Sequence, residues 1–109
     1  MKGIPNMGNL LKQAQQFQAK LAKLQEELAA RTVEATSGGG MVTVVANGRQ
    51  EVISIRIDTE VIDREDKEML QDLILAAVND ALSRAKAMVN EEMGKLTHGL
   101  NLPQIPGLM

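Results

Sequence analysis

The chain has 109 residues, no cysteine, one phenylalanine as its single aromatic residue, and a formal net charge of −2 at pH 7. This length fits one domain, and the absence of cysteine excludes disulfides, a thiolate nucleophile and sulfur-ligated metals. The scarcity of aromatic rings argues against proteins that stack single-stranded bases on such rings. No apolar run reaches the ~20 residues of a membrane span, and no apolar stretch follows Lys2, so we expect no secretory signal and a cytoplasmic location.

The charges are unevenly distributed along the chain. Residues 1–25 contain four lysines and no acidic residue, whereas residues 58–72 contain seven acidic residues and two basic ones. An asymmetry of this kind indicates a protein that interacts with a charged partner.

A first helix is predicted over residues 9–30, with Asn6 or Asn9 as its cap. Its apolar residues alternate in spacing between three and four over about three heptads. They are Met7, Leu10, Ala14, Phe17, Leu21, Leu24 and Leu28. This seam is narrow and long, so part of it is expected to pack on the sheet or on a second subunit and part to project into solvent.

The polar side of the same helix places Lys12, Gln16 and Lys23 on one face, with Lys20 at its flank. A stripe of this kind can follow phosphates without reading bases. The alternative interpretation is an ordinary solvated lysine face, but the absence of acidic residues before Glu26 favours a functional one.

Three strands are predicted next, in an antiparallel meander rich in β-branched residues, over residues 32–36, 41–46 and 50–57. Asn47-Gly48 predicts a two-residue hairpin of type I′. We interpret Gly38-Gly39-Gly40 as a flexible hairpin loop and not as a phosphate cradle, because no lysine and no helix N-terminus follows it. The third strand places Ile53, Ile55 and Ile57 on one face.

A second helix is predicted to start near Asp63 and Asp66, which resemble a capping box, and to run to about Met93, with Gly94 as its stop. Its apolar arc is wider than one small sheet can cover, so it indicates a second subunit. The residues assigned to that dimer interface are Leu70, Ile74, Leu75, Val78, Leu82 and Val89. Residues 1–93 are expected to form the domain, and the Gly/Pro-rich residues 94–109 a mobile tail.

Catalysis is not expected from this sequence. The one histidine, His98, falls in the predicted tail without an orienting partner, and no serine has a base to activate it. No set of His or carboxylate residues has metal-ligand spacing, so we expect no cofactor, no metal and no small-molecule substrate.

The chain resembles the YbaB/EbfC family of bacterial nucleoid-associated proteins over nearly its whole length. The resemblance rests on the order and spacing of several segments, namely Asn9 to Gln16, Gly38 to Val42, Asn47-Gly48 with Glu51-Val52, Lys67 to Ile74, and Ala76 to Ala81. Two positions depart from the family pattern, because Thr43 stands where many members have lysine and Thr59 where many have proline. The missing lysine weakens any contact with DNA through the sheet.

This resemblance implies an α+β fold in which each protomer has the order α-β-β-β-α, an intertwined homodimer with projecting helices, and binding of double-stranded DNA with low sequence specificity in the bacterial nucleoid. The leading hypothesis is therefore a dimer that holds DNA phosphates with Lys12, Lys20 and Lys23, assisted by Gln16, Lys2 and Arg31. The alternative is a protein-interaction module that uses the heptad seam or the Leu-rich tail.

Overall fold

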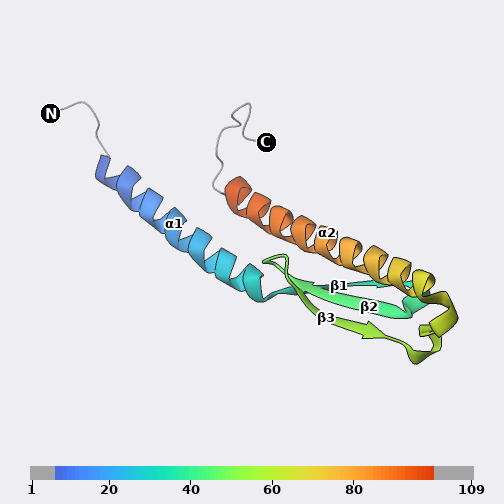
Figure 1. Ribbon diagram of the computed structural model, residues 1–109. Coiled ribbons are helices and arrows are strands. Elements are labelled where there is room, and N and C mark those ends of the chain that lie inside the picture. Colours follow the sequence, from blue (N-terminus) through green and yellow to red (C-terminus); the bar gives the residue numbers. More distant parts are fainter. Residues whose placement is uncertain (1–6, 100–109) are drawn as a thin grey trace.

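The computed structural model describes residues 7–99 and shows an elongated molecule with two helices and one small sheet (Figure 1). The order α-β-β-β-α and the α+β class are as predicted. The helices are α1 (Met7–Ala30) and α2 (Lys67–Gly99), and the strands are β1 (Thr32–Ser37), β2 (Val42–Asn47) and β3 (Val52–Ile57). The 3₁₀ turns are η1 (Gly38–Gly40), η2 (Thr59–Val61) and η3 (Arg64–Asp66). Neither described helix is long and apolar enough to cross a membrane.

The sheet is an antiparallel meander in the order β1-β2-β3. Val44 of β2 lies opposite Ala35 of β1 and Ile55 of β3, so these three side chains share one face. The register between β2 and β3 shifts after Val45, which makes Ile53 the extra residue of a β-bulge. One face of the sheet is therefore apolar across all three strands.

Helix α2 covers that apolar face only in part. Ala77, Ala81 and Ala85 recur every four residues and are fully buried against β1 and β2, where Val42 and Val44 are fully buried too. The small alanine side chains let the helix lie close to the sheet. Because α2 packs mainly on β1 and β2, Val52, Ile53 and Ile55 of β3 are left exposed.

Helix α1 projects away from the sheet like an arm (Figure 1). The predicted seam shows a gradient of burial along this arm. Leu28 is buried where α1 meets the sheet, Leu21 and Leu24 are half-buried, and Leu10 is 59% exposed near the tip. The seam thus anchors α1 at its C-terminal end, Phe17 is half-buried midway, and residues 7–16 are exposed.

The hairpin between β2 and β3 differs from the prediction. Asn47 N donates to Glu51 O at 3.0 Å and Gln50 N donates to Asn47 O at 2.9 Å, which closes a loop over residues 48–50 with Gln50 at a φ of 62°. The two-residue type I′ turn is therefore wrong, and the loop is a longer three-residue one. Gly48 is required for a different reason, because a Cβ there would overlap the carbonyl oxygen of Leu28 at the end of α1.

The glycines of η1 form a defined turn and not a loosely extended loop. Their φ angles are 62°, 69° and 94°, a left-handed conformation that other residues rarely adopt. The Ser37 hydroxyl before them donates to the Leu73 carbonyl at 2.6 Å, which ties the turn to α2.

Both predicted ends of the second helix need correction. Asp63 accepts from Glu65 N within η3, and it is Asp66 that accepts from Met69 N at 3.2 Å in the first turn of α2. The helix also continues through Gly94 to Gly99. An interior glycine costs only about 1 kcal/mol relative to alanine, and good helix formers surround Gly94, so it does not stop the helix. Residues 100–109 of the predicted tail lie outside the described residues.

Candidate nucleic-acid interface

The lysines predicted to hold phosphates lie exposed along the projecting arm. Lys12, Gln16, Lys20 and Lys23 all face solvent on α1, and the helical rise places Lys12 about 16 Å from Lys23 along the axis. We call these four residues the basic face of α1. Lys2 lies outside the described residues.

The C-terminal half of the basic face, Lys20 and Lys23, lines a cleft between α1 and α2. The cleft has a volume of about 400 Å³, and it is lined by Lys20, Lys23, Leu24, Glu27, Glu92, Lys95 and Leu96. Lys20 and Lys23 thus line the same cleft as Lys95 of α2. Lys12 and Gln16 lie beyond the cleft, toward the N-terminal tip of α1.

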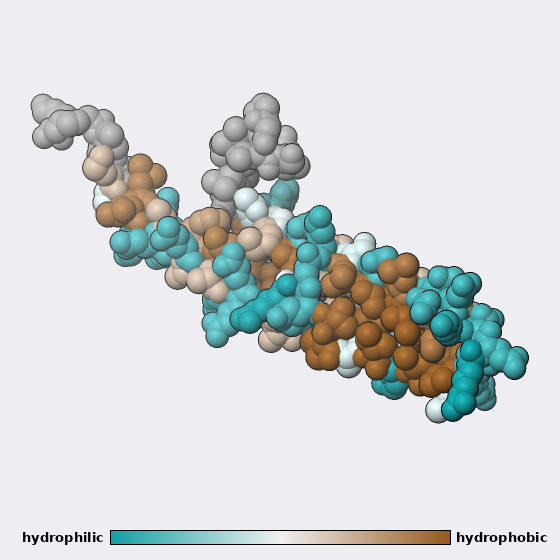
Figure 2. Space-filling model, viewed as in Figure 1, coloured by the Kyte–Doolittle hydropathy of each residue, from teal (hydrophilic) through white to brown (hydrophobic). Residues whose placement is uncertain are grey.

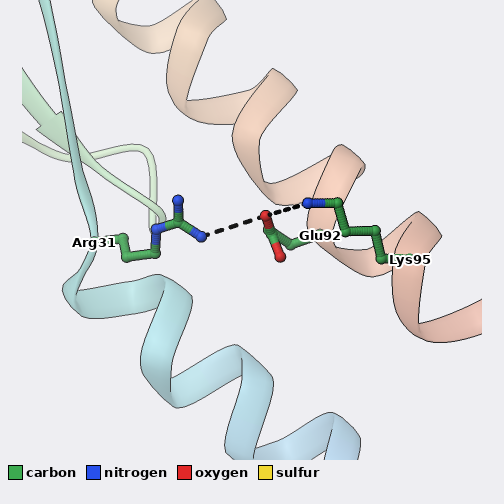
Figure 3. A network of polar contacts seen from close by, with 3 residues as sticks. All are labelled: Arg31, Glu92 and Lys95. Atoms are coloured by element: carbon green, nitrogen blue, oxygen red, sulfur yellow. Dashed lines mark hydrogen bonds and ion pairs between the residues drawn. The ribbon is translucent and has the colours of Figure 1, made fainter.

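A polar network crosses from the base of the arm to α2 (Figure 3). Arg31, the residue between α1 and β1, places Nη1 at 3.4 Å from Glu92 Oε1, and Lys95 Nζ lies at 3.3 Å from the same oxygen. The hydrogen bond from Lys95, together with the charges of Lys95 and Arg31, lowers the pKa of the Glu92 carboxyl below its ordinary value despite some desolvation. Arg31, predicted as an assisting DNA contact, is therefore held in an ion pair.

A second surface is apolar and lies at the sheet end of the molecule (Figure 2). Its members include Ile53, Ile55 and Val52 of β3, which are 54%, 45% and 38% exposed, and Leu75 of α2, which is 60% exposed. We call these four residues the apolar surface. Large exposed apolar patches on soluble proteins commonly mark interfaces with other molecules.

The residues predicted for a dimer interface divide into three groups. Leu70, Ile74, Val78 and Leu82 are partly buried and pack against the core of their own protomer. Leu75 is exposed and belongs to the apolar surface. Val89 is half-buried beside Leu28 and Gly48, where α1, α2 and the β2–β3 loop meet.

Known proteins are similar to this chain over most of its length. Residues 1–100 match the model of the YbaB/EbfC DNA-binding family. The chain belongs to the YbaB/EbfC DNA-binding family. It is 58% identical over 102 residues to a nucleoid-associated protein of Syntrophobacter fumaroxidans, covering 92% of this chain and 93% of the relative. It is 55% identical over 101 residues to one of Bacillus thuringiensis, covering 93% of both chains. The resemblance predicted from the sequence is confirmed.

A solved structure supports the fold of this YbaB/EbfC family member. An uncharacterized protein from Helicobacter pylori matches it with a TM-score of 0.57 at 29% identity, over 80% of this chain and 96% of the other. The two proteins therefore share the arrangement of helices and strands.

Two features of this family member were missed from the sequence. Lys95 and its partner Glu92 were not recognised, because the helix was predicted to stop before Gly94. Their i, i+3 spacing on a continuing helix is the signal that identifies the pair. The exposure of β3 was also missed, because strand alternation shows that residues share a face but not whether a helix covers it.

The part of this family member that the structure describes presents a cationic arm, a cleft and an apolar surface. Within residues 7–99 no three His, Asp or Glu side chains are grouped so that they could hold a metal ion. His98, predicted to lie in the tail, is exposed in the last turn of α2.

Proposed function

We propose that this protein is a homodimeric, nucleoid-associated protein of the bacterial cytoplasm that binds double-stranded DNA with low sequence specificity through the basic face of α1. The observation that carries this proposal is the arm itself, which presents three lysines and no acidic residue from Met7 to Gln25 and projects clear of the sheet. Membership of a DNA-binding family and the names of its relatives support it.

The proposed mechanism is neutralisation of phosphates and release of their counterions, with no covalent step. Lysine and glutamine side chains at this face can contact phosphates on any sequence, and α1 carries no arginine to read guanine by a bidentate contact. Affinity should therefore depend strongly on salt and weakly on sequence.

The overall negative charge is compatible with this mechanism because the charges are separated in space. The acidic residues of the segment 58–72 lie at the sheet end of the molecule, in η2, η3 and the start of α2, while the arm extends from the opposite end (Figure 1). The field of DNA should repel the acidic end and attract the arm, which orients the protein as it approaches.

The proposed dimer is formed through the apolar surface. About half of each of the Ile53, Ile55 and Leu75 side chains is exposed in the protomer. A two-fold interface uses the same patch on both protomers, so one contact would bury both copies. The dimer would present two arms to one duplex. Once one arm is bound, the second is held near the DNA at a high effective concentration, so two weak contacts would give a stronger one together.

The test is charge reversal on the arm compared with charge reversal elsewhere. We expect Lys12→Glu with Lys23→Glu to abolish binding of a random duplex, measured by fluorescence anisotropy. The matched control is Arg64→Glu with Lys67→Glu, which makes the same change in net charge at two exposed residues of the acidic end and should leave most binding intact. Equal loss in both variants would refute the assignment to the arm.

A protein-interaction module is the second candidate, because Leu10 and Leu11 are 59% and 62% exposed at the tip of α1. If the seam docks a partner protein and DNA binding is indirect, Leu10→Asp should abolish binding of that partner. The double variant Lys12→Glu with Lys23→Glu should leave partner binding intact. The two candidates therefore predict opposite results from the same set of variants.

A further inference from the structure

Four cationic side chains lie in or beside the cleft between α1 and α2, and two of them pair with the carboxylate of Glu92. Lys20 and Lys23 line this cleft from α1, and Lys95 lines it from α2. Arg31 reaches the same carboxylate, that of Glu92, from the base of the arm. Glu27 is the second acidic side chain that lines the cleft, so the cations outnumber the acids there.

The carboxylate of Glu92 is the anion that Arg31 and Lys95 share. Both Arg31 Nη1 and Lys95 Nζ approach the one oxygen Oε1, at 3.4 Å and 3.3 Å. The two nitrogens are thus already spaced to share a single oxyanion (Figure 3). Glu92 is also the least exposed of the three, at 23% against 55% for Arg31 and 65% for Lys95, so the cations keep room for a second partner from solvent.

We propose that this cleft is a binding site for one backbone phosphate of DNA, formed by Arg31 and Lys95 and flanked by Lys20 and Lys23, and that Glu92 is its internal counterion. The inference rests on the proposed function and adds to it an α2 contact and a residue that opposes binding. A phosphate oxygen takes over the place of Glu92 Oε1 between the two nitrogens, and the displaced carboxylate turns toward solvent.

Glu92 therefore weakens DNA binding in two ways. It competes with the phosphate for Arg31 and Lys95, and its charge repels the DNA backbone. In the absence of DNA the same carboxylate holds the two cations in place and ties the base of α1 to α2. The arm is thereby kept close to the geometry that the phosphate requires.

The experiment measures the affinity of a random duplex for Glu92→Gln by fluorescence anisotropy at physiological salt. Glu91→Gln is the matched control, since Glu91 is the exposed neighbour in the same helix and the change in charge is identical. Because an exposed ion pair is a weak interaction and a dimer holds two copies, we expect Glu92→Gln to bind about fivefold more tightly than the wild type. Glu91→Gln should remain near the wild-type value.

Two further measurements separate this role from a merely structural one. The gain of Glu92→Gln should shrink as salt increases, because it is electrostatic, and it should vanish when Lys95→Gln is added. Unchanged or weaker binding by Glu92→Gln, or an equal gain in Glu91→Gln, would overturn the role of Glu92 as an internal counterion. The proposed function would still stand in that case, provided that the wild type binds DNA. If the wild type and every variant fail to bind at low salt, the proposed function and this inference both fall.

Discussion

The apolar surface makes a quantitative prediction for the proposed dimer, which Ile55→Asp tests. Ile55 is 45% exposed in the protomer. Full burial of such a side chain is worth about 1.5–3 kcal/mol, so burying the exposed part contributes about 1 kcal/mol for each copy. A two-fold interface contains two copies, and the resulting loss of about 2 kcal/mol corresponds to a roughly 30-fold weaker dimer. The buried carboxylate weakens it further.

The assay is sedimentation equilibrium across a range of protein concentrations, with circular dichroism to verify that the variant stays folded. Ser54→Asp is the control, because Ser54 is the adjacent exposed residue of β3 and lies on the opposite face of the sheet. We expect Ser54→Asp to dimerise like the wild type. A folded Ile55→Asp variant with an unchanged dimer dissociation constant would refute the assignment of this surface, as would equal weakening by Ser54→Asp.

Three other predictions concern stability and are checked by thermal or acid unfolding. Gly48→Ala should destabilise the protein by about 1–3 kcal/mol, because the added Cβ overlaps the Leu28 carbonyl and forces the backbone to shift; an unchanged melting temperature would contradict this. Gly94→Ala should stabilise it by about 1 kcal/mol, since the site is an open helix interior; a lower melting temperature would contradict that. The pKa of Glu92 is lowered in the folded state, chiefly by Lys95, so its ion pairs should stabilise the protein at neutral pH and be lost as the pH falls through that pKa; Glu92→Gln should lack this acid-dependent loss.

The fold was largely predictable because its local signals agree with one another. The seam from Leu10 to Leu28 indicated α1, and strand alternation with Asn47-Gly48 indicated the meander, although the loop type differed. The end of α2 was not predictable from Gly94 alone. A single glycine costs about 1 kcal/mol, and whether the helix continues depends on its neighbours, including the pairing of Lys95 with Glu92.

The candidate site was predictable in part, for a related reason. The exposed lysines of α1 follow from helical periodicity, which is a local property. The approach of Arg31 to Glu92 joins residues far apart in sequence, and no local pattern contains it. The exposure of Ile53 and Ile55 likewise depends on where α2 lies across the sheet, and that position is set by the close packing of Ala77, Ala81 and Ala85.

The most direct test of the central claim is the salt dependence with which the wild-type protein binds a random duplex, measured by fluorescence anisotropy. If Lys12, Lys20 and Lys23 of both protomers each neutralise one phosphate, the logarithm of the association constant should fall linearly with the logarithm of the salt concentration, with a slope of about −5. A verified dimer that shows no binding at low salt, or binding whose affinity does not change with salt, would contradict the account.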